Sequence, residues 1–113
     1  MKLYHNPRCQ KSREALKILQ DKGLEPQLVL YMKEPLLPTE LQELLDKLDM
    51  QAEELVRTKE NIWKEEFADK ELTHEEVLLA MIEYPQLMER PILENGDKAV
   101  VGRPPEKILE VLI

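Results

Sequence analysis

Residues 1–31, MKLYHNPRCQKSREALKILQDKGLEPQLVLY, decide the fold of this chain. Apolar residues predict two short strands, one over residues 1–5 and the other over residues 26–31. Between them, apolar residues at helical spacing predict a helix over about residues 10–22, and Gly23 is a typical helix stop. This strand–helix–strand order predicts two parallel strands joined by a crossover helix.

The middle of the chain has the sequence pattern of helices. Pro35 and Pro38 predict a loop, and the capping boxes Thr39-Glu40-Leu41-Gln42 and Thr73-His74-Glu75-Glu76 predict two helix starts. Two shorter helices are expected over residues 52–56 and 59–67. No strand pattern interrupts this part, so we expect an all-helical insertion over about residues 36–88.

Strand patterns return after the insertion. Residues 91–93 and 98–101 flank Glu94-Asn95-Gly96-Asp97, and Asn-Gly between apolar runs predicts a β-hairpin. Prolines after Arg103 then open a last helix. The whole order predicts an α/β fold in one domain, residues 1–113: a mixed four-stranded sheet flanked by helices, with a central all-helical insertion.

Composition excludes several classes of function. The chain has 113 residues, with 23 acidic and 16 basic side chains and a net charge of −7, which disfavours non-specific binding of nucleic acid. It has no apolar run long enough to span a membrane and no signal-peptide pattern, so we expect a cytoplasmic protein without membrane contact. One cysteine and two histidines without ligand spacing predict no metal site.

The single cysteine, Cys9, is the candidate nucleophile. It precedes the predicted first helix, where unpaired N–H groups and the helix dipole stabilise a thiolate and lower its pKa. Arg8 and Lys11 add positive charge nearby. A lone cysteine is often only a small buried apolar residue, but Cys9 lies among polar neighbours rather than on an apolar face.

Other polar residues surround this helix start. Ser12 could offer its hydroxyl to the sulfur or to a bound anion, Arg13 lies one turn further on, and the exposed N–H groups suit a tetrahedral oxyanion. His5 could tune the thiol, or could simply be a hydrogen-bonded residue at the end of a strand. His74, in the first turn of a charged helix, is expected to face solvent.

Four segments, in order along the chain, carry a family resemblance: Tyr4-His5-Asn6-Pro7-Arg8-Cys9-Gln10-Lys11-Ser12-Arg13, Leu55-Val56-Arg57-Thr58-Lys59, Arg90-Pro91-Ile92 and Val101-Gly102-Arg103-Pro104. They resemble motifs of the arsenate reductase (ArsC) family of the glutaredoxin-coupled type. The resemblance implies a thioredoxin-like fold and a cis Arg90–Pro91 bond. It implies Cys9 as the catalytic residue, an oxyanion site made by Arg57, Arg90 and Arg103, and supporting roles for His5, Asn6, Ser12, Arg13 and Pro91.

The chemistry that the resemblance implies is reduction of arsenate or a similar oxyanion. Cys9 would form a covalent sulfur–arsenic adduct, glutathione would attack the adduct, and glutaredoxin would remove the glutathione. No bound cofactor is implied, because glutathione acts as a co-substrate, and a monomer is expected. Three arginines would balance the repulsion between a thiolate and an anion.

Two other functions remain open on the sequence alone. A monothiol thiol-transferase or deglutathionylating enzyme would suit Cys9-Gln10-Lys11-Ser12, which has one thiol. A regulator of the Spx type, which binds RNA polymerase, has the same fold, but its Cys-x-x-Cys switch is absent here. The three arginines favour the enzyme.

Overall fold

The computed structural model describes residues 1–112, which form two compact units. The first unit comprises Met1–Glu34 and the segment that starts at Arg90, and the second is Pro35–Glu89. The second unit spans the residues of the expected insertion. The first unit contains every described residue of the four-stranded sheet.

The sheet of the first unit has the strand order β2-β1-β3-β4. Its elements are β1 (Lys2–Tyr4), α1 (Gln10–Asp21), β2 (Gln27–Val29), β3 (Ile92–Asn95), β4 (Lys98–Val101) and the 3₁₀ helix η2 (Pro105–Val111). Strand β1 pairs with β2 in parallel, and β3 pairs antiparallel with both β1 and β4. The prediction of a mixed four-stranded sheet flanked by helices is confirmed.

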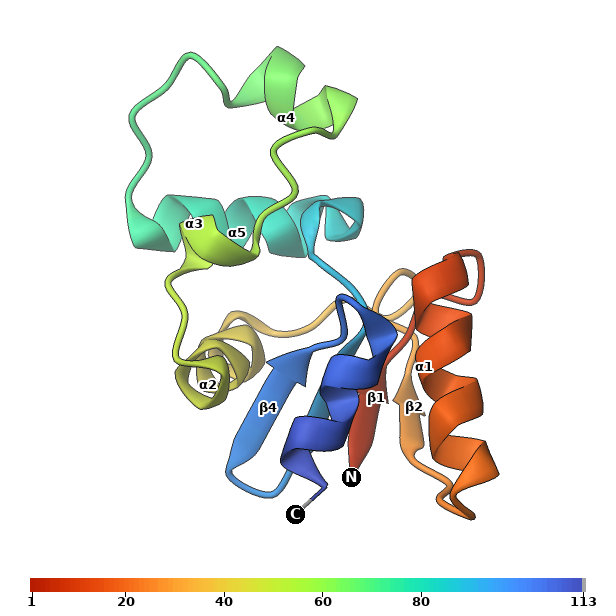
Figure 1. Cartoon of the computed structure of the whole chain (residues 1–113). Helices are drawn as coiled ribbons and strands as arrows, with labels where there is room; N and C mark the ends of the chain where they lie inside the picture. The colour runs from red at the N-terminus through yellow and green to blue at the C-terminus, as the bar shows by residue number, and fades with distance from the viewer. Residues whose placement is uncertain (113) are drawn as a thin grey trace. The chain divides into compact units, whose positions relative to one another are not determined.

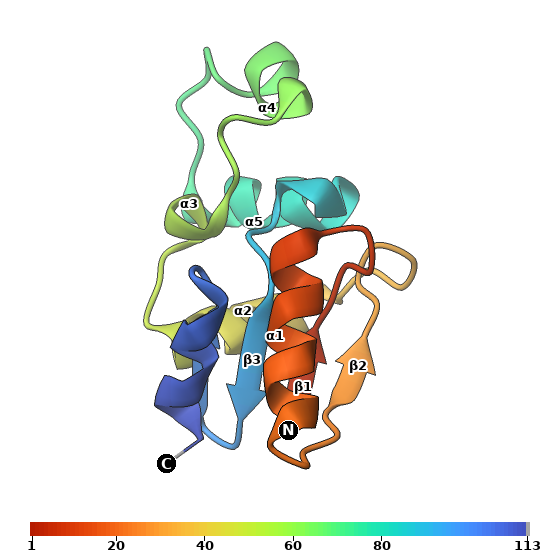
Figure 2. The same cartoon turned by 45° about the vertical axis from the view of Figure 1, so that its right-hand side comes forward.

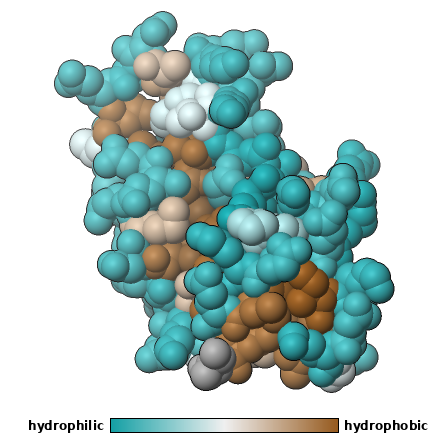
Figure 3. All heavy atoms as spheres, viewed as in Figure 1, coloured by the Kyte–Doolittle hydropathy of each residue, from teal (hydrophilic) through white to brown (hydrophobic). Residues whose placement is uncertain are grey.

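The core of the first unit lies between this sheet and two helices. Helices α1 and η2 lie side by side over one face of the sheet, as Figures 1 and 2 show. The core residues come from β1, β3, α1 and η2: Leu3, Ala15, Leu19, Leu93, Ile108 and Val111. Apolar surface remains visible over η2 towards α1 (Figure 3). Leu16 and Leu112, which pack against this core, are only partly buried. This packing holds α1 against the sheet.

The predicted hairpin forms, with its turn one residue later than Asn-Gly. The strands end at Asn95 and resume at Lys98, so the loop is Gly96-Asp97. Gly96 has a φ of +65°, a conformation that favours glycine. Asn95 stays in the strand, where it pairs with Lys98, and its side-chain amide donates to the carbonyl of Val111 at 2.7 Å. The amide therefore ties the hairpin to η2.

The second unit is a helical bundle. Its elements are α2 (Pro38–Leu48), α3 (Ala52–Leu55), α4 (Asn61–Glu66), α5 (His74–Glu83) and the 3₁₀ turn η1 (Pro85–Leu87). Helix α5 packs against α2, α3 and η1. One isolated antiparallel bridge, Val56 with Met88, joins the segment after α3 to the segment after η1. The prediction of helices in this part of the chain is confirmed.

One of the two predicted helix starts is correct. Thr73 caps α5 as expected: its hydroxyl accepts from the Glu76 N–H at 3.2 Å, and Glu76 accepts from the Thr73 N–H at 3.0 Å. Helix α2, in contrast, begins at Pro38, ahead of Thr39, and the Glu40 carboxylate accepts from the Leu37 N–H at 2.8 Å. Proline suits the first helical position because its missing N–H would be unpaired there.

The expectation that His74 faces solvent is wrong. Its Nδ1 accepts from the N–H of Ala52 at 3.1 Å, and its Nε2 lies 2.7 Å from Oε1 of Gln42. The ring is half-buried and joins α5 to α2 and α3. The helical pattern gave no sign of this, because both partners come from elements distant in sequence. Within residues 1–112, no helix has the length and apolar content that crossing a membrane requires.

Candidate active site

Cys9 occupies the N-cap position of α1, as the sequence predicts. Its backbone is extended, with φ −94° and ψ 123°. The Cys9 N–H donates to the carbonyl of Asn6 at 2.9 Å, and the Cys9 carbonyl accepts from the N–H of Arg13 at 3.0 Å. The thiol is half-buried and forms no disulfide. It therefore lies at the positive end of the helix dipole.

Side chains of the loop itself hold its backbone. The Asn6 side-chain oxygen accepts from the N–H of Arg8 at 3.1 Å, which is an Asx turn. The Arg13 guanidinium donates to the carbonyl of Pro7 at 2.9 Å. Asn6 and Arg13 therefore have structural roles in the loop, consistent with the supporting roles that the family resemblance implies.

His5 and Ser12 form a buried pair beneath the loop. His5 is 4% exposed, Ser12 is fully buried, and Nδ1 of His5 lies 2.6 Å from the Ser12 hydroxyl. The same hydroxyl accepts from the N–H of Asn6 at 3.0 Å. The expectation that this hydroxyl faces the sulfur or an anion is therefore wrong: it is bonded to strand-end groups. Burial and, to a smaller extent, the charge of Arg13 lower the pKa of His5.

Two of the expected arginines meet at the sulfur. Arg103 donates through Nε to the carbonyl of Arg90 at 2.8 Å, and its Nη2 lies 4.0 Å from the Cys9 Sγ. Within residues 1–112, the Arg90 nitrogens Nε and Nη1 are buried without a hydrogen-bond partner. Buried guanidinium nitrogens without partners are costly, so these two are candidate donors to an oxyanion.

The pKa of the Cys9 thiol is lowered from its ordinary value. Partial burial alone would raise this pKa, but the N–H of Ser12, the side chain of Arg90 and the N–H of Lys11 together outweigh it. Ser12 thus assists the thiolate through its backbone and not through its hydroxyl. The result is a thiol that ionises more readily than a free cysteine, as a nucleophile requires.

Pro91 and Gly102 pack the two arginine segments together. The implied cis bond at Arg90–Pro91 is present, and the Arg103–Pro104 bond is cis as well. The Gly102 N–H donates to the Pro91 carbonyl at 2.8 Å. A Cβ on Gly102 would lie 3.0 Å from side-chain atoms of both Ile108 and Pro91. Only glycine fits this approach without a shift, and it immediately precedes Arg103.

Arg57 belongs to the second unit, where it lies near two carboxylates. Its guanidinium lies 3.7 Å from Glu89 and 4.0 Å from Glu60, and its N–H donates to the Leu87 carbonyl. Its Nη1 is buried without a hydrogen-bond partner among residues 1–112. A role for Arg57 in an oxyanion site stays a prediction.

The sequence reasoning missed one part of this region. Leu30, Met32 and Lys33 follow β2 and line a pocket together with residues of the Cys9 loop. The available signal was topological, because adjacent parallel strands bring the segments after them to the same edge of a sheet. In the described part of the chain, no group of three or more His, Cys, Asp or Glu side chains could hold a metal ion.

Comparisons with known proteins agree with this geometry. The sequence model of the ArsC family matches residues 4–111. A Haemophilus influenzae protein named arsenate reductase is 43% identical to this chain, and the match covers 97% of each chain. The Escherichia coli K12 protein YfgD, described as uncharacterized, is 48% identical, and that match covers 99% of this chain and 96% of YfgD. A solved Vibrio cholerae structure named arsenate reductase superposes with a TM-score of 0.93 at 39% identity, covering 99% of this chain and 98% of that one. The thioredoxin-like fold is thereby confirmed.

Proposed function

The chain belongs to the ArsC family, and from this premise we propose that it reduces arsenate to arsenite with electrons from glutathione and a glutaredoxin. Cys9 is the nucleophile, and Arg90 and Arg103, with Arg57 from the second unit, bind the oxyanion. The observation that carries the proposal is the thiol at the N-terminus of α1, with two arginines directed at it and a lowered pKa. A thiolate beside guanidinium groups is suited to attack on an anion, because their positive charge offsets the repulsion between the two.

The proposed reaction balances with one thiol in this chain and two from outside. Cys9 displaces one oxygen of arsenate as water and forms a sulfur–arsenic bond. Glutathione displaces a second oxygen of the adduct as water, and a glutaredoxin thiol then attacks the glutathione sulfur, so that the electron pair of the sulfur–arsenic bond to glutathione stays on arsenic. Water hydrolyses the remaining bond between arsenic and Cys9, which releases arsenite and restores the thiol, and the two external thiols end as a mixed disulfide. A single cysteine therefore suffices.

The test is an arsenate-reduction assay with glutathione, glutaredoxin, glutathione reductase and NADPH. We expect arsenate-dependent NADPH oxidation by the native chain, and a loss of about 10³-fold or more in Cys9→Ser because no sulfur–arsenic bond can form. Phosphate, a tetrahedral anion that is not reduced, should compete with arsenate and slow alkylation of Cys9. These two readouts separate oxyanion binding from turnover.

One result would overturn the proposal. If Cys9 alkylates rapidly at neutral pH but no arsenate is reduced, the reactive thiol serves another substrate. Reduction of a glutathionylated peptide by the same preparation would then assign the chain to the monothiol transferases. Capture of RNA polymerase by the native chain, without activity on either substrate, would instead assign it to the regulators.

A further inference from the structure

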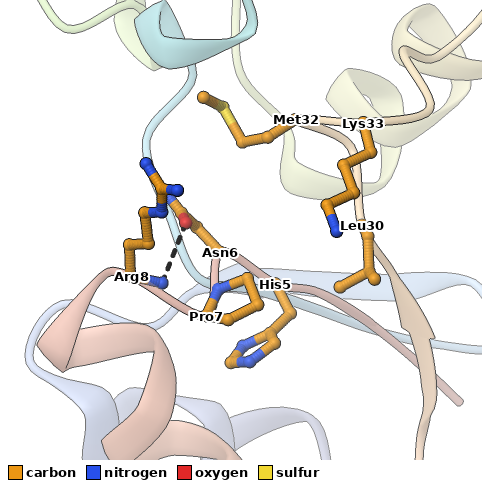
Figure 4. Close-up of a pocket in the computed structure, with 7 residues that line it drawn as sticks. All are labelled: His5, Asn6, Pro7, Arg8, Leu30, Met32 and Lys33. Atoms are coloured by element: carbon orange, nitrogen blue, oxygen red, sulfur yellow. Dashed lines mark hydrogen bonds between the residues drawn. The ribbon is translucent and has the colours of Figure 1, made fainter.

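A pocket of about 370 Å³ lies beside the loop that carries Cys9. One wall is formed by residues 5–8, and the opposite wall by Leu30, Met32 and Lys33, which follow β2 (Figure 4). Strands β1 and β2 are parallel, so the segments after them meet at one edge of the sheet. This volume is in the range of small-molecule sites. The pocket therefore has room for a ligand larger than an oxyanion.

Two cations line this pocket without partners. Neither the Arg8 guanidinium nor the Lys33 ammonium forms an ion pair or side-chain hydrogen bond within residues 1–112. No acidic residue lines the pocket. In a chain of net charge −7, two such cations create a local positive field that favours an anionic ligand.

The remaining lining is apolar or already bonded. Pro7, Leu30 and Met32 add apolar surface to the same lining. The His5 ring is bonded to Ser12, and in Figure 4 it points away from Met32 and Lys33. A ligand that matches this lining combines carboxylates with uncharged parts.

We propose that the pocket binds the carboxylates of the peptide thiol that attacks the Cys9 adduct, a γ-glutamyl tripeptide of the glutathione class, with Arg8 and Lys33 as the recognition residues. This inference rests on the proposed function. Arg8 directly precedes Cys9, and the Asn6 carbonyl, in the same wall, accepts from the Cys9 N–H. A tripeptide anchored here has its cysteine beside the loop of the nucleophile. Holding the second thiol in place makes its attack effectively intramolecular.

Binding can be measured without any turnover. S-methylglutathione, which has both carboxylates but no free thiol, is titrated into Cys9→Ser and followed by NMR of the backbone amides. We expect saturable shifts at Asn6, Arg8 and Lys33, and affinity about tenfold weaker when Lys33→Ala is added, as for the loss of one charge-assisted contact. Lys22→Ala, an exposed lysine at the end of α1, is the matched control and should bind normally. Absence of shifts at these residues, or equal affinity in the Lys33 and Lys22 variants, would overturn the proposal.

A kinetic experiment tests the same assignment in the native chain. Lys33→Ala should raise the KM for glutathione about tenfold while the KM for arsenate and the turnover with 2-mercaptoethanol, which has no carboxylate, stay unchanged. An equal loss with both thiols would contradict recognition of carboxylates. If no thiol supports arsenate reduction, the proposed function fails, whereas the S-methylglutathione titration still decides whether the pocket binds the tripeptide.

Discussion

The arginines of the two units have different neighbours. In the first unit, Arg103 is bonded to the Arg90 carbonyl and approaches the Cys9 sulfur, and Arg90 helps to lower the pKa of the thiol. In the second unit, Arg57 lies near Glu60 and Glu89. In the first unit, called the sheet unit from here on, the arginines therefore already surround the thiol in the absence of substrate. Arg57, in the second or helical unit, has carboxylate neighbours with which an oxyanion would compete.

This difference separates two kinds of contribution to the proposed reaction. Groups that stabilise the thiolate act on the nucleophile at all times, and they change its reactivity towards any electrophile. A group that only binds the oxyanion changes turnover of arsenate and leaves the reactivity of the thiol alone. Alkylation of Cys9 and reduction of arsenate therefore measure different things.

Among the arginines, the largest effect is expected from Arg90. Arg90→Ala should raise the pKa of Cys9, because it removes a hydrogen bond and a positive charge from the thiolate, and it should lower kcat/KM for arsenate by about 10²–10³-fold. Arg57→Ala should lower arsenate turnover but leave the thiol pKa unchanged. The measurements are the pH profile of alkylation by iodoacetamide and the arsenate assay.

Arg90→Lys serves as the matched control for charge. It keeps a cation but loses the planar fork, so the thiol pKa should stay near the native value while arsenate turnover still falls. If Arg90→Ala alkylates with the native pH profile, Arg90 does not stabilise the Cys9 thiolate. A raised thiol pKa in Arg57→Ala would contradict the division between the two arginines.

Local sequence patterns predicted most of the fold. Strand and helix periodicity over residues 1–31 and the Asn-Gly hairpin are local signals, and the structure follows them. The position of Cys9 at a helix start, and with it a lowered thiol pKa, was predictable because both depend on its own helix. The partners of His74 and of the Ser12 hydroxyl were not identifiable, since each hydrogen bond joins groups from separate elements. The meeting of Arg90 with Arg103 required the family resemblance for the same reason.

A second prediction concerns the stability of the helical unit. His74→Ala removes the acceptor for the N–H of Ala52, a residue that is fully buried, and the contact with Gln42. Leaving a buried N–H without a partner should lower the free energy of unfolding by about 1–3 kcal/mol. Urea denaturation measures the loss, and the pKa of Cys9 should not change.

Glu75→Ala is the control for this variant, because Glu75 is exposed in the same turn of α5. It should change the free energy of unfolding by no more than about 0.5 kcal/mol. An equal loss in both variants would show that the His74 hydrogen bonds add nothing beyond the effect of substituting the first turn. A shifted pKa of the Cys9 thiol in His74→Ala would contradict the expectation that this substitution affects only the stability of the helical unit.

A smaller effect is expected at the hairpin of the sheet unit. Gly96 has a φ of +65° with open space where a Cβ would lie, so Gly96→Ala meets backbone strain but no clash. The expected loss is about 1 kcal/mol in the free energy of unfolding. Gly96→Asn should lose less, because asparagine tolerates this conformation better. Equal losses for alanine and asparagine in thermal unfolding would contradict strain as the cause.

The smallest effect is a dependence of stability on pH that originates in the sheet unit. The folded pKa of Cys9 is lowered, so between that value and the ordinary thiol pKa the folded state binds fewer protons than the unfolded state. The free energy of unfolding should therefore rise with pH in this window, and fall as pH drops through the folded pKa. The folded pKa of His5 is also lowered, so the free energy of unfolding should fall again as the pH drops below the ordinary histidine pKa of about 6.5.

Urea denaturation at a series of pH values separates these two contributions. Cys9→Ser should flatten the alkaline rise and keep the acid fall, because serine does not ionise in this range, whereas His5→Asn should flatten the acid fall and keep the alkaline rise. Each slope should be only a fraction of the roughly 1.4 kcal/mol per pH unit that one full proton would give. If Cys9→Ser retains the native alkaline slope, folding does not favour the thiolate. The arginines of the first unit would then not stabilise the thiolate, and they would no longer differ in this respect from Arg57.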